Sequence, residues 1–283
     1  MLLPTMTPEE IYAEMHKDAE WLENTINKKF VPLFQKGAKR ANNFPYFKPF
    51  YDVSSKTLIT YWVVMIAYHR SDWKKPRVAI FTKYSHEYGS NIIYIENDRF
   101  AIRLYTPHFL QRIKERCSAM NYKVPVEFSQ HEDIMLILSN RDVEELTMWK
   151  ELEKKHKENE LFQELYAEAH KTKFWQDPDY ERYGVACDSG LCLCERNKKN
   201  PNISIYNTIV SPDMLIDFQR YDFFLSYVKV YLRTMEREYP RQRDTWGREY
   251  EQLRNSTEDI DAFIKGFVDL MIDFTKRYPR HYL

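Results

Sequence analysis

A chain of 283 residues can bury a substantial core, and we interpret it as one composite domain over residues 1–283, with 172–181 as the candidate internal boundary. Lysine plus arginine balance aspartate plus glutamate at 42 each, so the overall charge gives no attraction toward nucleic acid or an anionic membrane. The six glycines form neither G-x-G-x-x-G nor G-x-x-x-x-G-K-[ST], which argues against ordinary dinucleotide and P-loop nucleotide binding, and we expect no cofactor.

The first helix is predicted to begin at Thr7-Pro8-Glu9-Glu10, which combines a threonine cap, an early proline and a glutamate three residues after the cap. Pro32 is expected to bend or end this helix before Gly37. Residues 42–49 (NNFPYFKP) contain two prolines and are predicted to form a loop, and residues 58–69 are predicted to form a buried strand.

Three further strands are predicted over residues 77–84, 91–96 and 99–105, which are rich in β-branched and aromatic residues. Asn97-Asp98 separates the last two strands and suits a tight hairpin turn. Directly afterwards, Thr106 can cap a helix whose first residue is Pro107. The chain is therefore predicted to leave an antiparallel hairpin and enter a helix.

The candidate catalytic residues lie on this helix and in the preceding loop. His108, Arg112 and Arg116 recur at every fourth position, so they share one helix face. Imidazole can exchange a proton near neutral pH, and guanidinium groups suit phosphate or carboxylate. His86, expected on a loop between two strands, can complement His108 as an acid and base pair, although the reading as an unrelated surface histidine is favoured. Because exposed helix faces are commonly basic, a structural role for this face is favoured over a catalytic one.

The spacing H-x-x-x-R-x-x-x-R, from His108 through Arg112 to Arg116, resembles a helix of some small bacterial toxin families related to the RelE-like ribonucleases. The resemblance covers about a dozen residues. It implies metal-independent RNA cleavage, with His108 in proton transfer and the arginines on phosphate.

The second half of the chain is predicted to add helices and then strands. Ser129-Gln130-His131-Glu132 offers another capping box, and residues 143–170 are expected to form one long helix or a helical hairpin. Strands over 182–187 and 191–196 flank a hairpin turn, and residues 202–210 supply a third strand. These three strands either extend the first sheet or make a small second one.

Three cysteines cluster at the predicted hairpin: Cys187, Cys192 and Cys194. They could hold zinc if Cys117 or a histidine supplied a fourth ligand. Their C-x-x-x-x-C-x-C spacing is not a usual zinc pattern, and cysteine also packs as a small apolar residue, so we expect no metal.

The C-terminal part is predicted to be helical. Ser211-Pro212-Asp213 opens a long aromatic helix that ends near Tyr239, and Asn255-Ser256-Thr257-Glu258 starts the last helix. The predicted fold class is thus α+β: an antiparallel sheet of about four N-terminal strands plus three from residues 182–210, covered by several helices that include the long C-terminal ones.

Location and partners follow from what the chain lacks. Four cysteines do not make a disulfide scaffold in a chain of this length, and the N-terminus MLLPTMTPEE does not resemble a secretory leader. The longest apolar run, residues 58–68, is shorter than the roughly 20 residues that span a bilayer. We predict a cytoplasmic protein without a membrane partner. A protein partner or homo-oligomer fits this reading, and a nucleic acid would need a local basic patch.

No motif fixes a reaction. The expected function is therefore a binding or protein-interaction role without catalysis of its own. The alternative is a metal-independent phosphodiesterase or ribonuclease-like enzyme that uses the face formed by His108, Arg112 and Arg116, with His86.

Overall fold

The computed structural model describes residues 1–86, 89–96, 99–119, 132–139, 142–146, 179–187, 190–211, 214–215, 242–256 and 260–277. The chain divides into two compact units. The first unit comprises Met1–Arg141, Thr147–Gly184 and Cys192–Ile209, and the second comprises Asp142–Leu146, Val185–Leu191 and Val210–Leu283. That residues 1–283 act as one composite domain stays a prediction.

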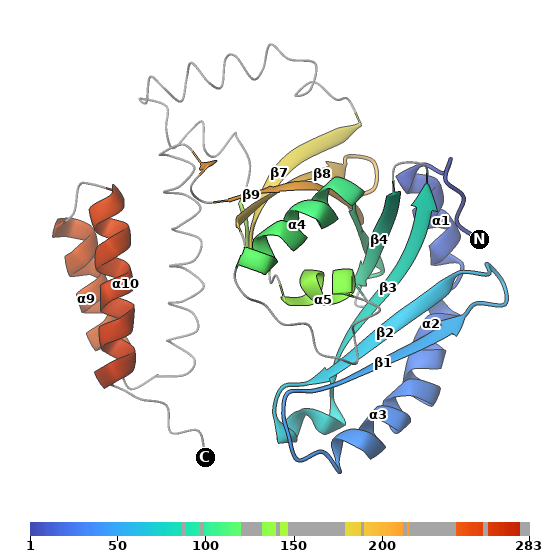
Figure 1. The fold of residues 1–283 in the computed structure, drawn as a ribbon, viewed down its shortest axis with the longest axis horizontal. Coiled ribbons are helices and arrows are strands. Elements are labelled where there is room, and N and C mark those ends of the chain that lie inside the picture. Colours follow the sequence, from blue (N-terminus) through green and yellow to red (C-terminus); the bar gives the residue numbers. More distant parts are fainter. Residues whose placement is uncertain are drawn as a thin grey trace. The chain divides into compact units, whose positions relative to one another are not determined.

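The first unit is built on a β-sheet (Figure 1). Its first five strands form an antiparallel meander in which each strand pairs with the next: β1 (Tyr46–Val53), β2 (Thr60–Ala67), β3 (Arg77–His86), β4 (Gly89–Glu96) and β5 (Ala101–Tyr105). The order then continues through β9 (Ile203–Val210), β8 (Gly190–Asn197) and β7 (Tyr180–Cys187). The later strands therefore extend the first sheet, and the α+β class is confirmed.

The sheet is mixed rather than purely antiparallel, which corrects the prediction. β5 pairs with β9 in parallel, with Ile102 opposite Ile203 and Tyr105 opposite Tyr206. Parallel neighbours require a crossover connection, and here about a hundred residues separate the two strands. Nothing in the local pattern of either strand specifies that orientation.

Two further strands lie where the sequence predicted other structure. β1 begins inside the predicted loop 42–49, because β1 is the edge strand and an edge position tolerates Pro49, which has no N–H to donate. In the second unit, Asp142–Leu146 forms strand β6 and not the start of a helix over 143–170. Pairing between strands overrides the helical preference of its glutamates there. The rest of that predicted helix lies outside the described residues.

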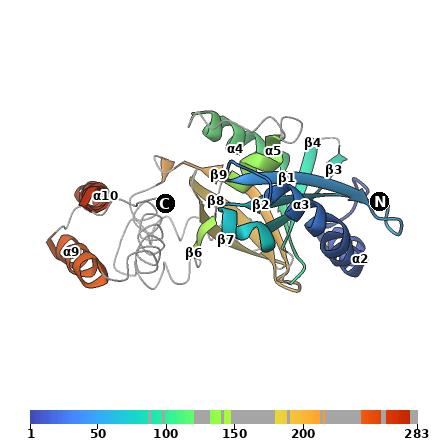
Figure 2. The same ribbon diagram turned by 90° about the horizontal axis from the view of Figure 1, so that it is seen from below.

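A run of N-terminal helices covers one face of β1 to β5 (Figures 1 and 2): α1 (Pro8–His16), α2 (Ala19–Thr25), the π-helix η1 (Ile26–Phe30) and α3 (Val31–Ala38). The predicted capping box is confirmed, since the Thr7 side chain accepts from the Glu10 N–H and the Glu10 carboxylate accepts from the Thr7 N–H. Pro32 does not end the helical run. It lies in the first turn of α3, directly after a π turn in which the Val31 N–H donates to the Ile26 carbonyl.

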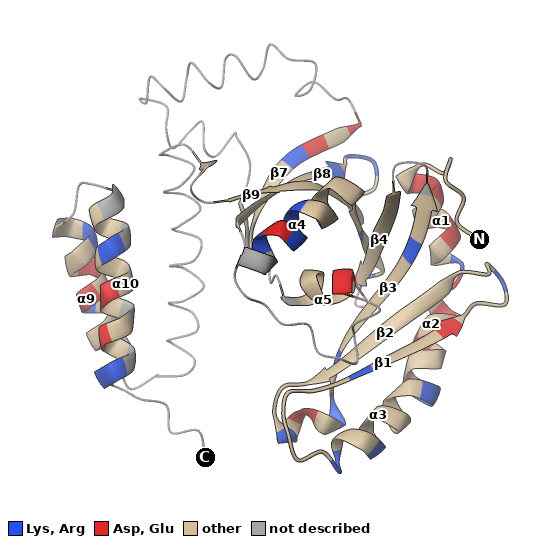
Figure 3. Cartoon of the chain, in the orientation of Figure 1, with Lys and Arg blue, Asp and Glu red and all other residues tan. Residues whose placement is uncertain are grey.

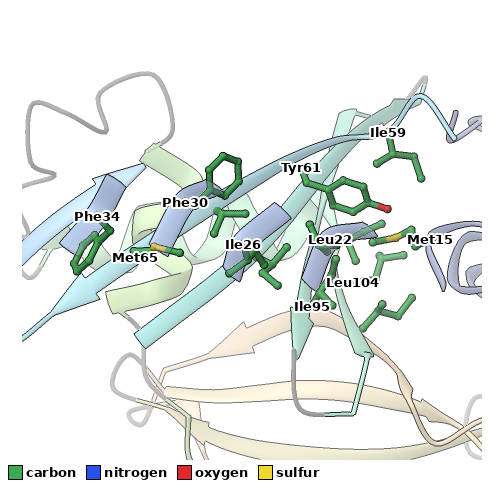
Figure 4. Packing of buried hydrophobic residues seen from close by; sticks show 14 of the residues in the cluster. Met15, Leu22, Ile26, Phe30, Phe34, Ile59, Tyr61, Met65, Ile95 and Leu104 are labelled. Atoms are coloured by element: carbon green, nitrogen blue, oxygen red, sulfur yellow. The ribbon is translucent and has the colours of Figure 1, made fainter. Parts of the chain in front are cut away.

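The main core lies between these helices and the sheet (Figure 4). Met15, Leu22, Ile26, Phe30 and Phe34 are each at most 3 % exposed and pack on alternate residues of the strands. Each large apolar side chain buried in this way contributes roughly 1.5–3 kcal/mol. The 3.6-residue spacing on the helices and the two-residue spacing on the strands therefore meet at one interface.

A buried carboxylate ties the same helices to the β1–β2 turn. Asp18 is 1 % exposed and accepts hydrogen bonds from Ser54 Oγ at 2.6 Å, from Tyr61 Oη at 3.0 Å and from the Thr57 hydroxyl. Burial, together with the Asp18 charge, raises the pKa of the Tyr61 hydroxyl. Tyr61 therefore stays a donor to Asp18, and the cluster is a structural anchor.

The other face of the sheet is covered by α4 (Pro107–Ala119) and α5 (Glu132–Ser139), as Figure 2 shows. The predicted start of α4 is confirmed, because Thr106 Oγ1 accepts from the Phe109 N–H at 3.2 Å. The Phe109 ring centroid is 5.1 Å from that of Tyr105, whereas the neighbouring Leu104 packs in the main core. Successive strand residues point to opposite faces, so α4 lies opposite α1 to α3.

The described helices of the second unit form an antiparallel-looking pair in Figure 1: α9 (Arg243–Ser256) and α10 (Ile260–Arg277). Trp246 packs edge-on against Phe274 at 5.1 Å, and Arg277 forms two hydrogen bonds to Glu249 at 2.8 and 2.7 Å. Asn255 and Ser256 end α9 and do not start the last helix. The predicted helix over 213–239 lies outside the described residues. None of the described helices is long and apolar enough to cross a membrane.

Candidate binding surface

Helix α4 presents the predicted polar face. His108 and Arg112 are exposed, whereas Phe109 and Ile113 are each 1 % exposed and face the sheet. The amphipathic prediction for this helix is confirmed. Arg116 is half-buried. The helix therefore exposes the imidazole of His108 and the guanidinium of Arg112 on the side away from its apolar contacts.

Both guanidinium groups of this face have partners within the protein. Arg112 Nη1 is 3.0 Å from a carboxylate oxygen of Glu115, and this hydrogen bond is the first cause of the lowered pKa of Glu115. Arg116 Nη2 donates to the Ile209 carbonyl at 2.9 Å, which ties α4 to β9. The two groups thus take part in a surface ion pair and in a helix–strand contact.

His86 ends strand β3 and does not lie in a loop. Its backbone pairs with Gly89, and its side chain lies outside the described residues. A Cβ placed on Gly89 would be 3.1 Å from Cβ of Pro107, so the backbone at this end of the hairpin lies against the first residue of α4. The catalytic roles of His86, His108, Arg112 and Arg116 stay predictions.

A third guanidinium, that of Arg103, lies on the α4 side of the sheet. Arg103 pairs with Glu96 at 2.5 Å, and its guanidinium carbon is 5.8 Å from the ring centroids of both Tyr94 and Tyr206. This packing between two tyrosines and a carboxylate makes Arg103 part of the fold.

The three cysteines of the strand hairpin are buried thiols. Cys187, Cys192 and Cys194 are each at most 2 % exposed, and the Cys187 thiol donates to the Gly190 carbonyl at 3.0 Å. Within the described ranges, no three side chains of the histidine, cysteine, aspartate or glutamate type are placed to hold a metal ion. The side chain of Cys117 lies outside those ranges, so metal binding by these thiols stays untested.

A different cationic surface forms where α3 ends and β2 leads into β3. The short 3-10 helix η2 (Arg70–Lys74) lies in that connection and packs against α3. Trp73 lies on η2, and seven exposed cations lie on η2, at the end of α3 and at the start of β3. We call these cations and Trp73 the Trp73 surface: Lys36, Lys39, Arg40, Arg70, Lys74, Lys75 and Arg77. Figure 3 shows the Lys and Arg at the end of α3.

Side-chain contacts show that the two basic segments meet at Trp73. Lys39 Nζ of α3 is 5.8 Å from the centroid of the indole, and Lys74 Nζ of η2 is 5.5 Å from it. Gln35 Nε2 donates to the Lys74 carbonyl at 3.0 Å, which fixes η2 on α3. The half-buried indole therefore packs on the core and lies near ammonium groups that come from two different elements.

The cations of the Trp73 surface have no acidic partner among the described residues. None of the seven forms an ion pair with an acid in the described ranges. The one acid of η2, Asp72, accepts from the His69 N–H at 2.9 Å, and this backbone hydrogen bond lowers the pKa of Asp72. Asp72 thus serves as a cap, and the surface keeps a strong positive excess.

Sequence reasoning missed this surface. Its signal is present as two short basic stretches, KGAKR at 36–40 and RSDWKKPR at 70–77, but about thirty residues separate them and the net charge of the chain is zero. Each stretch alone matches an ordinary solvated surface, and the first also complements the C-terminal end of α3. Only the packing of η2 on α3 makes one patch of them.

Comparison of the chain with protein-family models, with curated proteins and with solved structures finds no match in any of the three.

Proposed function

We propose that this protein is a binding protein without catalysis of its own, and that it binds an anionic polymer through the Trp73 surface. The observation that carries the proposal is the set of seven exposed cations without an acidic partner among the described residues. Cations held close together repel one another, and a bound polyanion offsets this unfavourable electrostatic free energy. A positive surface also raises the local concentration of an anionic ligand and its association rate.

A charge-reversal experiment tests this proposal. Lys39→Glu, Lys74→Glu and Lys75→Glu combined are expected to raise the Kd for fluorescein-labelled heparin, measured by fluorescence anisotropy, by about tenfold or more. The matched control combines Lys28→Glu, Lys265→Glu and Lys276→Glu, which change the net charge equally at exposed positions elsewhere. It is expected to change the Kd less than about twofold.

Two results contradict the proposal. If the two triple variants bind heparin equally well, the overall charge and not this surface attracts the polymer. If the native protein does not bind heparin at low salt, the surface has no such role.

A second candidate function is the metal-independent phosphodiesterase or ribonuclease, with His108 in proton transfer. The close approach of Gly89 to Pro107 favours it, because it brings the backbone pair of His86 and Gly89 to the start of α4. Against it, Arg112 and Arg116 already have partners, and a phosphate ligand would have to displace them.

A further inference from the structure

We infer that the anionic polymer bound by the Trp73 surface is a single-stranded nucleic acid, and that the indole of Trp73 is the platform on which one of its bases stacks. This inference rests on the proposed function and names the ligand class. Proteins that bind single strands without sequence preference combine a cationic track for the backbone with aromatic side chains for the bases. The Trp73 surface offers both components.

The first argument is the position of Trp73 among the cations. The indole is half-buried, so part of its ring is open to solvent, and ammonium groups of Lys39 and Lys74 lie 5.8 and 5.5 Å from its centroid. A base stacked on the ring gains more than a solvated lysine gains from its cation–π contact. The lysines can therefore move from the indole to the flanking phosphates when a base stacks.

The second argument is that the platform is preorganised. At the start of η2, the Asp72 N–H donates to the His69 carbonyl at 3.0 Å, and the Asp72 carboxylate accepts from the His69 N–H at 2.9 Å. The Gln35 amide fixes the next turn through the Lys74 carbonyl at 3.0 Å. The backbone that carries Trp73 is thus held from both sides, so little order has to be gained on binding.

A second exposed aromatic residue, Tyr68, contacts one of the cations of the Trp73 surface, Arg77. Tyr68 precedes η2 in the chain and is 42 % exposed. Its hydroxyl accepts a hydrogen bond from Arg77 Nη1 at 3.4 Å. The surface residues thus form two separate aromatic–cation contacts, one between Tyr68 and Arg77 and one between Trp73 and Lys74. A duplex keeps the faces of its bases stacked inside, and a sulfated polysaccharide has none, so only a single strand uses the rings.

The experiment measures three ligands on the full chain by fluorescence anisotropy: a labelled 12-residue oligouridine, an RNA duplex of the same length and labelled heparin. The native protein is expected to bind the single strand at least about tenfold more tightly than the duplex. Trp73→Leu is expected to raise the Kd for the single strand about tenfold and the Kd for heparin less than about twofold. Trp73→Phe keeps an aromatic face and is expected to bind nearly as the native protein does.

The matched control is Tyr51→Leu, which removes an aromatic ring that is 72 % exposed on the edge strand β1. It is expected to leave both affinities unchanged. A 12-residue oligothymidine in the same assay separates RNA from DNA, and tight binding of either strand supports the inference.

The failures are distinguishable. If duplex binds as tightly as the single strand, or if Trp73→Leu weakens heparin and oligouridine equally, the stacking inference is overturned while polyanion binding stands. If Trp73→Phe raises the Kd for the single strand as much as Trp73→Leu does, the ring has no stacking role. If neither heparin nor RNA binds the native protein, the proposed function itself fails.

Discussion

The two cationic surfaces of the first unit differ in how their charges are satisfied. On α4, Arg112 pairs with Glu115 and Arg116 donates to a carbonyl of β9. On the Trp73 surface, the cations face solvent and two of them lie over an indole. The regular spacing on α4 therefore identified arginines that have partners within the protein. The cations of the Trp73 surface, which have no acidic partner among the described residues, lie on segments distant in sequence.

This contrast predicts that Arg116 of α4 matters for stability and that the cations of the Trp73 surface matter for binding. A charged group that donates a buried hydrogen bond contributes to folding, whereas a solvated one contributes little. The following experiments test that division, beginning with the largest expected effect.

Arg116→Met is expected to lower the free energy of unfolding by about 2 kcal/mol, because a hydrogen bond from a charged group contributes about 1.5–3 kcal/mol. Its loss leaves the Ile209 carbonyl without this donor. The matched variant Arg40→Met, on the Trp73 surface, is expected to change stability by less than about 0.5 kcal/mol. Urea denaturation measures both, and equal changes would remove the distinction between the two surfaces.

The ion pair between Arg103 and Glu96 is expected to make the free energy of unfolding depend on pH. Burial raises the pKa of Glu96, but the charge of Arg103 and hydrogen bonds from Arg103 and Arg99 outweigh it, so the pKa lies below its ordinary value of 4.5. Such a carboxyl contributes stability above the unfolded pKa and loses it as the pH falls through the lowered folded pKa.

Glu96→Gln should therefore flatten the fall in stability between pH 7 and pH 3, followed by urea denaturation at a series of pH values. Arg40→Met, which removes a cation without a described acidic partner, should keep the native slope. A native slope in Glu96→Gln would show that this pair does not couple folding to protonation.

The smallest expected effect concerns the second candidate function. His108→Ala removes an exposed side chain and is expected to leave stability unchanged. With single-stranded RNA and excess chelator, the native protein and the variant should both leave the RNA intact. Cleavage by the native chain that disappears in His108→Ala would instead place chemistry on α4 and reverse the comparison of the two surfaces.

Local signals predicted much of the fold. The capping box of Thr7 and Glu10, and the cap of Thr106 before Pro107, are set by residues three or four apart, and both appear in the structure. The strands β2 to β5 were also predicted, because β2 lies in a nearly continuous apolar run and β3 to β5 are rich in β-branched and aromatic residues. These features depend on neighbours along the chain, which the sequence displays directly.

Other features depend on residues that only folding brings together. Pro49 favours a loop from the sequence alone, but it is accommodated in a strand because β1 lies at the edge of the sheet. The parallel pairing of β5 with β9 joins segments about a hundred residues apart. The candidate site divides in the same way. The spacing from His108 to Arg116 was visible in the sequence, but their partners were not.

The sequence by itself determined where most helices and strands begin and which of their faces are apolar, because capping and periodicity act over a few residues. Tertiary structure decided which charges are neutralised. Lys39 and Lys74 become neighbours over Trp73 only when η2 packs on α3, since electrostatic and aromatic contacts depend on distance in space and not on separation along the chain.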